Sequence, residues 1–186
     1  EFMLGFEPKS ELSKQGMMMF AMIPKETWVG KTMNEVGDEI LSEIGDGVKH
    51  FEEQIKYNLN LDFEPRSIVG DDYANIKEKS YGNADVDGPD SNHGTHVSGI
   101  IAAKRGNGLG IDGIAGDGNV RIMSVRTVPN GDERDKDVAN AIRYAVDNGA
   151  KILNMSFGKA YSPDKETVWE AFKYAADKGV LLIKAA

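Results

Sequence analysis

The sequence predicts an α/β fold in which a parallel sheet is wound with helices on both faces. Three segments rich in β-branched and aliphatic residues predict strands, at residues 120–128, 151–156 and 180–183. Two segments between them repeat apolar residues at steps of three or four and predict amphipathic helices, at residues 137–148 and 162–179. Parallel neighbours in a sheet need long crossover connections, and alternating strands and helices supply them.

The N-terminal part of the chain is predicted to contain one long helix. A proline and a glycine interrupt the chain up to residue 31, which is therefore predicted to be irregular. Thr32 and Glu35 have the spacing of a capping box, which marks a helix start. The helix runs to about Asn58, with a kink or break predicted near Gly45 because glycine costs about 1 kcal/mol relative to alanine. Its apolar residues form one stripe that predicts a packing face: Met33, Val36, Ile40, Ile44, Val48, Phe51 and Ile55.

Composition limits the class of partner. The chain has 186 residues, 40% of them hydrophobic, which is enough for one domain with a core. A net charge of -8 argues against nucleic acid and against an anionic membrane surface, so peptides or proteins are the predicted partners. The apolar run at residues 17–23 is far shorter than the ~20 residues of a membrane-spanning helix. The absence of cysteine excludes disulfides, thiol catalysis and thiolate metal sites.

The segment 92–99, N-H-G-T-H-V-S-G, holds two of the three histidines. A turn leads into it and apolar residues at helical spacing follow, so His93 is predicted at the start of a helix. An imidazole with a pKa of roughly 6.5 can accept and return a proton near neutral pH, as a general base for a hydroxyl nucleophile must. Two other interpretations stay open. His93 could be a turn residue without a catalytic role, or His93 and His96 could bind a metal ion together with Asp90, although no third ligand at zinc spacing follows the two histidines.

The run H-G-T-H-V-S-G resembles the histidine motif of the subtilisin-like serine proteases, the subtilases or peptidase S8 family. In that family the first histidine is catalytic. The resemblance therefore implies that His93 is the general base and that His96 is a buried residue of the helix. The later run N-M-S-F-G resembles the subtilase segment whose backbone pairs with an extended substrate and walls the pocket for the residue before the cleaved bond. It implies substrate-binding residues at Asn154, Ser156, Phe157 and Gly158.

The resemblance divides the chain. Residues 59–186 are predicted to be part of a subtilisin-like peptidase domain, and residues 1–58 a possible family-specific insertion. A subtilase has its catalytic triad in the chain order Asp, His, Ser. No D-S-G or D-T-G turn precedes His93, and the sequence ends at Ala186 before any serine motif or oxyanion-hole asparagine. The fold is therefore expected to be incomplete at both ends, and these residues alone are expected to be inactive.

The resemblance implies a serine-type endopeptidase, which hydrolyses peptide bonds through an acyl-enzyme. The alternative is a non-catalytic subtilase-like module that binds an extended peptide along residues 154–158 by strand addition. The charged run 132–137 and Phe157 are predicted to shape the specificity pocket. The family implies a secreted or cell-envelope protein, although the sequence shows no signal peptide.

No cofactor is predicted, and a structural calcium ion stays open at two places. The family resemblance allows one in the glycine-rich loop at residues 106–113. Residues 59–90, predicted to be a long ordered loop, could hold another, although they lack the EF-hand pattern. The acidic residues concerned are Asp71, Asp72, Asp85 and Asp87.

The last strand is expected to lack part of its cover. In subtilases the helix that bears the serine covers one face of the sheet, and that motif is absent from this sequence. Residues 180–183 would then expose apolar side chains that contribute roughly 1.5 to 3 kcal/mol each when fully buried. We therefore expect the isolated chain to be only marginally stable and prone to associate.

Overall fold

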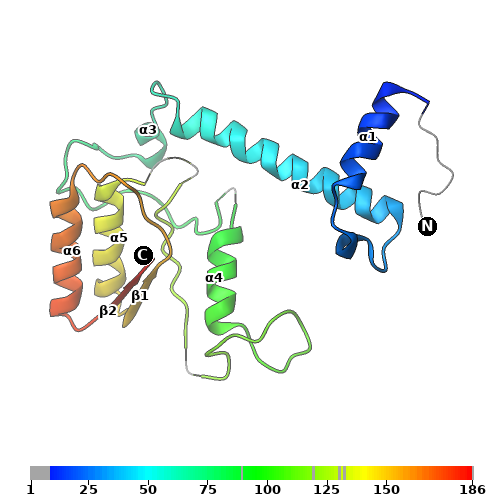
Figure 1. The fold of residues 1–186 in the computed structure, drawn as a ribbon. Coiled ribbons are helices and arrows are strands. Elements are labelled where there is room, and N and C mark those ends of the chain that lie inside the picture. The colour runs from blue at the N-terminus through cyan, green and yellow to red at the C-terminus, as the bar shows by residue number, and fades with distance from the viewer. Residues whose placement is uncertain (1–8, 89, 119, 130, 132, 186) are drawn as a thin grey trace. The chain divides into compact units, whose positions relative to one another are not determined.

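The computed structural model describes residues 9–185 apart from 89, 119, 130 and 132 (Figure 1). No helix among these residues is long and apolar enough to cross a membrane. The helices are α1 (Glu11–Ala21), α2 (Met33–Glu53), α3 (Arg66–Val69), α4 (Asn92–Ala102), α5 (Asp135–Asp147) and α6 (Lys165–Asp177). A 3-10 helix η1 (Lys25–Trp28) and a π-helix η2 (Gln54–Asn58) accompany them, and the strands are β1 (Ile152–Met155) and β2 (Leu181–Lys184).

The chain divides into two compact units, Glu1–Glu52 and Glu53–Ala186. Helix α2 of the first unit begins at the predicted capping box. The Thr32 backbone N–H donates to Glu35 Oε2 at 2.6 Å, and the Glu35 N–H donates to Thr32 Oγ1 at 3.4 Å. The predicted break near Gly45 is wrong, because α2 is continuous and passes directly into η2. The domain boundary after residue 58 stays a prediction.

Two other expectations for the first unit are wrong. Helix α1 lies in the segment predicted to be irregular, and its start is capped by Ser10, whose Oγ accepts the Ser13 N–H at 3.1 Å. The stripe of α2 is predicted to pack, yet among those of its members whose burial the structure describes, residues 36–55, only Val36 is buried. Val48 and Phe51 are 52% and 64% exposed. The periodicity is real, but nothing among the described residues of the first unit covers most of the stripe.

The second unit contains the parallel sheet that the sequence predicts. Strands β1 and β2 pair in parallel, with Ile152 opposite Leu181 and Met155 opposite Lys184, and α6 is the crossover between them. Helices α5 and α6 lie side by side (Figure 1) and cover one face of the sheet. Their apolar faces enclose Leu153 and Met155 in the core of this unit. The α/β class with a parallel sheet is therefore confirmed.

The strand predicted at residues 120–128 does not form. No backbone hydrogen bond joins this segment to another described residue, although Val125 packs against the core. Its β-branched residues favour extended backbone, but a strand needs a partner to accept and donate ladder bonds. The composition of residues 120–128 therefore predicts an extended backbone, but it does not determine whether a second strand lies beside it.

Burial alternates along β1, so neighbouring residues provide a test of the core. Leu153 is 8% exposed and faces the helices, whereas Ile152 is 60% exposed on the opposite face. Leu153→Ala is expected to lower the free energy of unfolding by about 2 to 4 kcal/mol, because it leaves a cavity. Ile152→Ala is expected to change it by less than about 1 kcal/mol. Urea unfolding monitored by circular dichroism measures both, and equal losses would contradict this account of the core.

The opposite face of the sheet exposes Ile152, Leu181 and Ile183, at 60%, 55% and 47%. Nothing among the described residues covers these side chains. We expect the isolated chain to bind 8-anilinonaphthalene-1-sulfonate, and expect the triple replacement of these residues by threonine to reduce dye fluorescence. A monomer that binds no dye and unfolds sharply above about 60 °C would contradict this expectation.

Candidate active site

His93 is the second residue of α4, at the exposed start of the helix. Asp90 Oδ1 accepts the Asn92 N–H at 2.8 Å, and the Ser91 carbonyl accepts the Thr95 N–H at 2.9 Å. These bonds fix the first turn of α4 and so the backbone that carries the imidazole. The helix start predicted for His93 is confirmed. Its catalytic role stays a prediction.

His96 is exposed, and the prediction that it is buried is wrong. No residue of α4 is buried, and the core cluster of the second unit contains none of them. A side chain is buried only where another element packs over it. Among the described residues no element covers this face of α4.

The chain after α4 turns back on the end of the helix. The N–H groups of Ile114 and Ala115 donate to the carbonyls of Ile100 and Ile101 at 2.9 and 2.8 Å. Gly113 and Gly116 approach the backbone of Ala103 so closely that a Cβ at either position would clash with it. This close packing requires glycine at positions 113 and 116 whether or not a ligand binds there.

Neither calcium position gathers a set of ligands. In the loop at 106–113 the single carboxylate, Asp112, accepts the Gly106 N–H at 3.0 Å. Asp71 and Asp85 pair with cations of the chain, Lys136 and Arg126. Within the described ranges no three His, Cys, Asp or Glu side chains are placed to hold a metal ion. Calcium binding at either place stays a prediction.

Of the candidate substrate-binding residues, Asn154 lies within β1, and Ser156, Phe157 and Gly158 follow its end. Asn154 Nδ2 donates to Ser156 Oγ at 2.9 Å, Phe157 packs against the core, and Gly158 is exposed. No backbone–backbone hydrogen bond joins residues 156–163 to another described residue. The N–H and C=O groups at 156–158 could therefore pair with an extended peptide. No hydrogen bond or ion pair joins α4 to this segment in the described part of the chain.

The structure also contains a buried charge network that the sequence analysis missed. The side chains of Lys136 and Asp71 are both 0% exposed, and Lys136 Nζ lies 2.5 Å from Asp71 Oδ2. The same ammonium donates to the Asp72 carbonyl at 2.7 Å and to Glu78 Oε2 at 3.0 Å. All three of its hydrogens are thus used, which allows a lysine to be buried at the start of α5.

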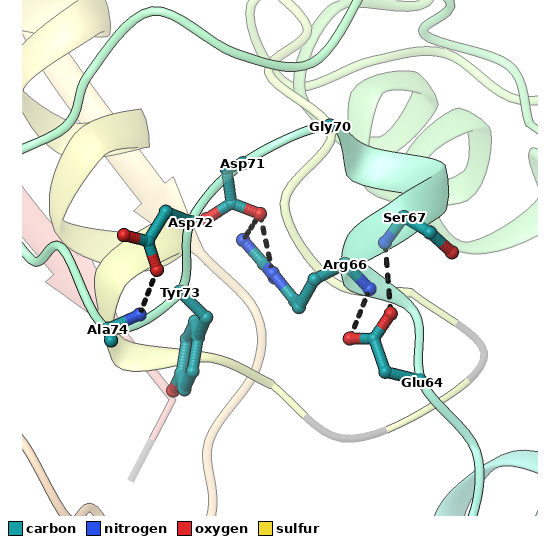
Figure 2. Close-up of a pocket in the computed structure, with 8 residues that line it drawn as sticks. All are labelled: Glu64, Arg66, Ser67, Gly70, Asp71, Asp72, Tyr73 and Ala74. Carbon is teal, nitrogen blue, oxygen red and sulfur yellow. Dashed lines mark hydrogen bonds and ion pairs between the residues drawn. The ribbon is translucent and has the colours of Figure 1, made fainter.

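Arg66 extends the network (Figure 2). Its Nε donates to Asp71 Oδ1 at 2.6 Å, as Figure 2 shows. Its two terminal nitrogens donate to the two carboxylate oxygens of Asp137 at 2.8 and 3.0 Å. Tyr81 donates its hydroxyl to Asp137 at 2.6 Å and accepts a hydrogen bond from Asn140. The loop between η2 and α4 is therefore attached to the first turns of α5.

Beside the network lies a hollow of about 500 Å³, lined by Glu64, Arg66, Ser67 and residues 70–74 (Figure 2). The guanidinium of Arg66 lies 4.9 Å from the centre of the Tyr73 ring, and that of Arg134 lies 5.7 Å from it. The ring is thus already occupied by cations of the chain.

In the charged run 132–137, predicted to shape specificity, Asp132 lies outside the described residues, and Asp135 to Asp137 are held in internal contacts.

The network and Asp135 predict acid sensitivity. Burial alone would raise the pKa of Asp71, but Arg66 and Lys136 lower it overall. Burial alone would also raise the pKa of Asp135, but the hydrogen bonds from the Asp164 N–H and the Lys159 ammonium outweigh it and lower the pKa overall. A lowered carboxylate pKa stabilises the fold above the unfolded value of about 3.9, and this contribution is lost as pH falls through the folded pKa. The urea midpoint should therefore hold from pH 7 to about 5 and fall below it. A midpoint constant down to pH 3 would contradict this.

Comparison with known proteins places the chain in a family. Residues 38–186 match the Subtilase family, so the chain belongs to it. It is 42% identical to a thermophilic serine proteinase of Bacillus sp. (strain AK1) over 113 residues. The matched residues make up 60% of this chain and 27% of the relative. It is 37% identical over 112 residues to the major intracellular serine protease of Bacillus subtilis (strain 168), covering 60% of this chain and 34% of that protein.

A C5a peptidase of Streptococcus pyogenes is 32% identical over 143 residues, which cover 72% of this chain and 12% of the relative. The chain thus matches no more than about a third of the length of these relatives. No solved structure matches the chain.

Proposed function

We propose that this chain is the middle part of the catalytic domain of a subtilisin-like serine endopeptidase. The observation that carries the proposal is the family match over residues 38–186, which includes the histidine motif. The exposed position of His93 at the start of α4 supports it, since a general base must reach its substrate. The substrates are peptides or proteins.

In the proposed reaction the His93 imidazole takes the proton from a serine hydroxyl as the oxygen attacks the peptide carbonyl carbon. The same imidazole then gives this proton to the leaving amine, and an acyl-enzyme remains for water to hydrolyse. Residues 154–158 bind the extended substrate through their backbone groups. We expect the serine and the carboxylate that orients His93 to come from residues outside this sequence, and expect the 186 residues alone to be inactive.

The experiment compares the 186-residue chain with the full product of its gene. Each is incubated with casein and with a serine-reactive fluorophosphonate. We expect the full protein to be labelled and to hydrolyse casein, and expect neither from the isolated chain. A full protein that is folded but takes no label would overturn the proposal. Labelling of the isolated chain that is lost in His93→Ala would place the nucleophile within these residues instead.

One observation favours a second candidate, a non-catalytic subtilase-like module that binds peptides. Among the described residues His93 has no carboxylate partner, whereas the backbone at 156–158 is available for strand addition. This candidate predicts that the full protein binds extended peptides and takes no label. The same experiment, with peptide binding measured by fluorescence anisotropy, separates the two.

A further inference from the structure

The segment that leaves β1 is shaped by side chains. Residues 156–163 form no backbone–backbone hydrogen bond with any described residue, so their own backbone does not fix their conformation. The candidate groove residues Ser156, Phe157 and Gly158 open this segment. Something else must hold the segment if its free N–H and C=O groups are to meet a substrate peptide in register.

The side chain of Asp135 holds this segment in place. Asp135 is the first residue of α5 and is 2% exposed. Its Oδ1 accepts the Ser162 hydroxyl at 2.9 Å and lies 3.0 Å from Lys159 Nζ, and its Oδ2 accepts the Asp164 N–H at 2.8 Å. One carboxylate thus contacts the segment at Lys159 and Ser162 and also contacts Asp164, the residue that follows it. Lys159 Nζ makes a further bond, to the Glu133 carbonyl at 2.6 Å.

Asp135 is itself fixed. The next residue, Lys136, is fully buried and bonded to Asp71, Asp72 and Glu78. Asp137 follows and forms a bidentate pair with Arg66. The start of α5 is therefore anchored on its other side, so the carboxylate of Asp135 presents a rigid set of acceptors to the segment.

We propose that Asp135 is a positioning residue of the substrate groove, which holds residues 159–164 so that Ser156 to Gly158 present their backbone to the substrate. This inference rests on the proposed endopeptidase function. Asp135 touches neither substrate nor reacting atoms in this role. Its contribution is to order the groove before the substrate arrives, which lowers the entropy cost of binding. Loss of that order raises KM and leaves the chemical step largely intact.

The experiment measures kcat and KM of the full protease on peptides that carry one to four residues before the cleaved bond. In the parent protein KM should fall as the peptide lengthens, because a longer strand pairs with more of the groove. Asp135→Asn is expected to raise KM for the longest peptide roughly tenfold. KM for the shortest should change less than about twofold, and kcat should be nearly unchanged. Lys159→Met removes the same contact from the other side and is expected to act in the same direction.

Asp147→Asn is the matched control. Asp147 ends the same helix and bonds the Tyr174 hydroxyl, at a solvent-exposed position. We expect it to leave the length dependence unchanged. Thermal unfolding of each variant shows whether it is folded at the assay temperature, and Lys159→Met supplies the test if Asp135→Asn is not.

The outcomes separate the two hypotheses. A wild-type protein that hydrolyses no peptide and takes no fluorophosphonate overturns the endopeptidase function, and the inference with it. An active wild type whose folded variants keep the same KM for every peptide overturns the inference alone. Equal losses on short and long peptides, carried by kcat, also overturn it, because they indicate general structural damage.

Discussion

His93→Ala in the full protease is expected to lower kcat by roughly 10⁴ to 10⁶, with KM changed little. In the proposed mechanism the imidazole takes and returns the proton of the serine hydroxyl, so its removal should remove the general base. Substrate binding is proposed to depend on residues 154–158 and should therefore persist. Steady-state hydrolysis of a chromogenic peptide measures both constants, and a fall in kcat of less than about tenfold would contradict the assignment.

His96→Ala is the matched control for this variant. It removes an equally exposed imidazole one turn further along the same helix. We expect kcat to change by less than about tenfold, because only the first histidine takes part in proton transfer. Equal losses from both variants, together with stoichiometric zinc in the purified protein, would instead support the metal-ligand interpretation of the histidine pair.

Local signals in the sequence predicted most of the fold. The Thr32 and Glu35 capping box located α2, and the apolar spacing of α5 and α6 located both helices of the second unit. These predictions succeeded because helix starts and amphipathic faces are specified by residues close together in the chain. The one helix of this kind that was missed, α1, has a serine cap at Ser10 without the glutamate that completes a capping box.

The failed predictions concern residues whose state depends on distant partners. The extended segment 120–128 has the composition of a strand and no ladder partner, and His96 has the pattern of a helix face and no cover. The candidate site divides in the same way. A motif singled out His93 and residues 154–158, whereas Asp135 and Lys136 lie in a charged run that is typical of a solvated surface. The burial of Lys136 depends on Asp71 and Glu78, which lie about 60 residues earlier, and Asp135 bonds Ser162 and Asp164, which lie 27 and 29 residues later.

Lys136→Met is expected to lower the free energy of unfolding of this chain by about 3 kcal/mol. Methionine keeps most of the side-chain volume and removes the charge. Glu78 and the Asp72 carbonyl would lose the ammonium as a donor, and the buried Asp71 would be left with Arg66 as its cationic partner. For a chain of this length the midpoint temperature should fall by roughly 6 to 12 °C. Urea and thermal unfolding measure the change.

Lys31→Met is the control that isolates burial. Lys31 Nζ lies 2.6 Å from Glu39, almost the same separation as in the buried pair, but its side chain is 37% exposed and that of Glu39 is 47% exposed. An exposed ion pair is worth at most about 1 kcal/mol, so the expected loss is under that value. The double variant Lys136→Met with Asp71→Leu should lose less than the sum of its single variants, by 1 kcal/mol or more, since neither charge is left buried alone. Additive losses, or equal losses at Lys31 and Lys136, would show that the network does not anchor the start of α5.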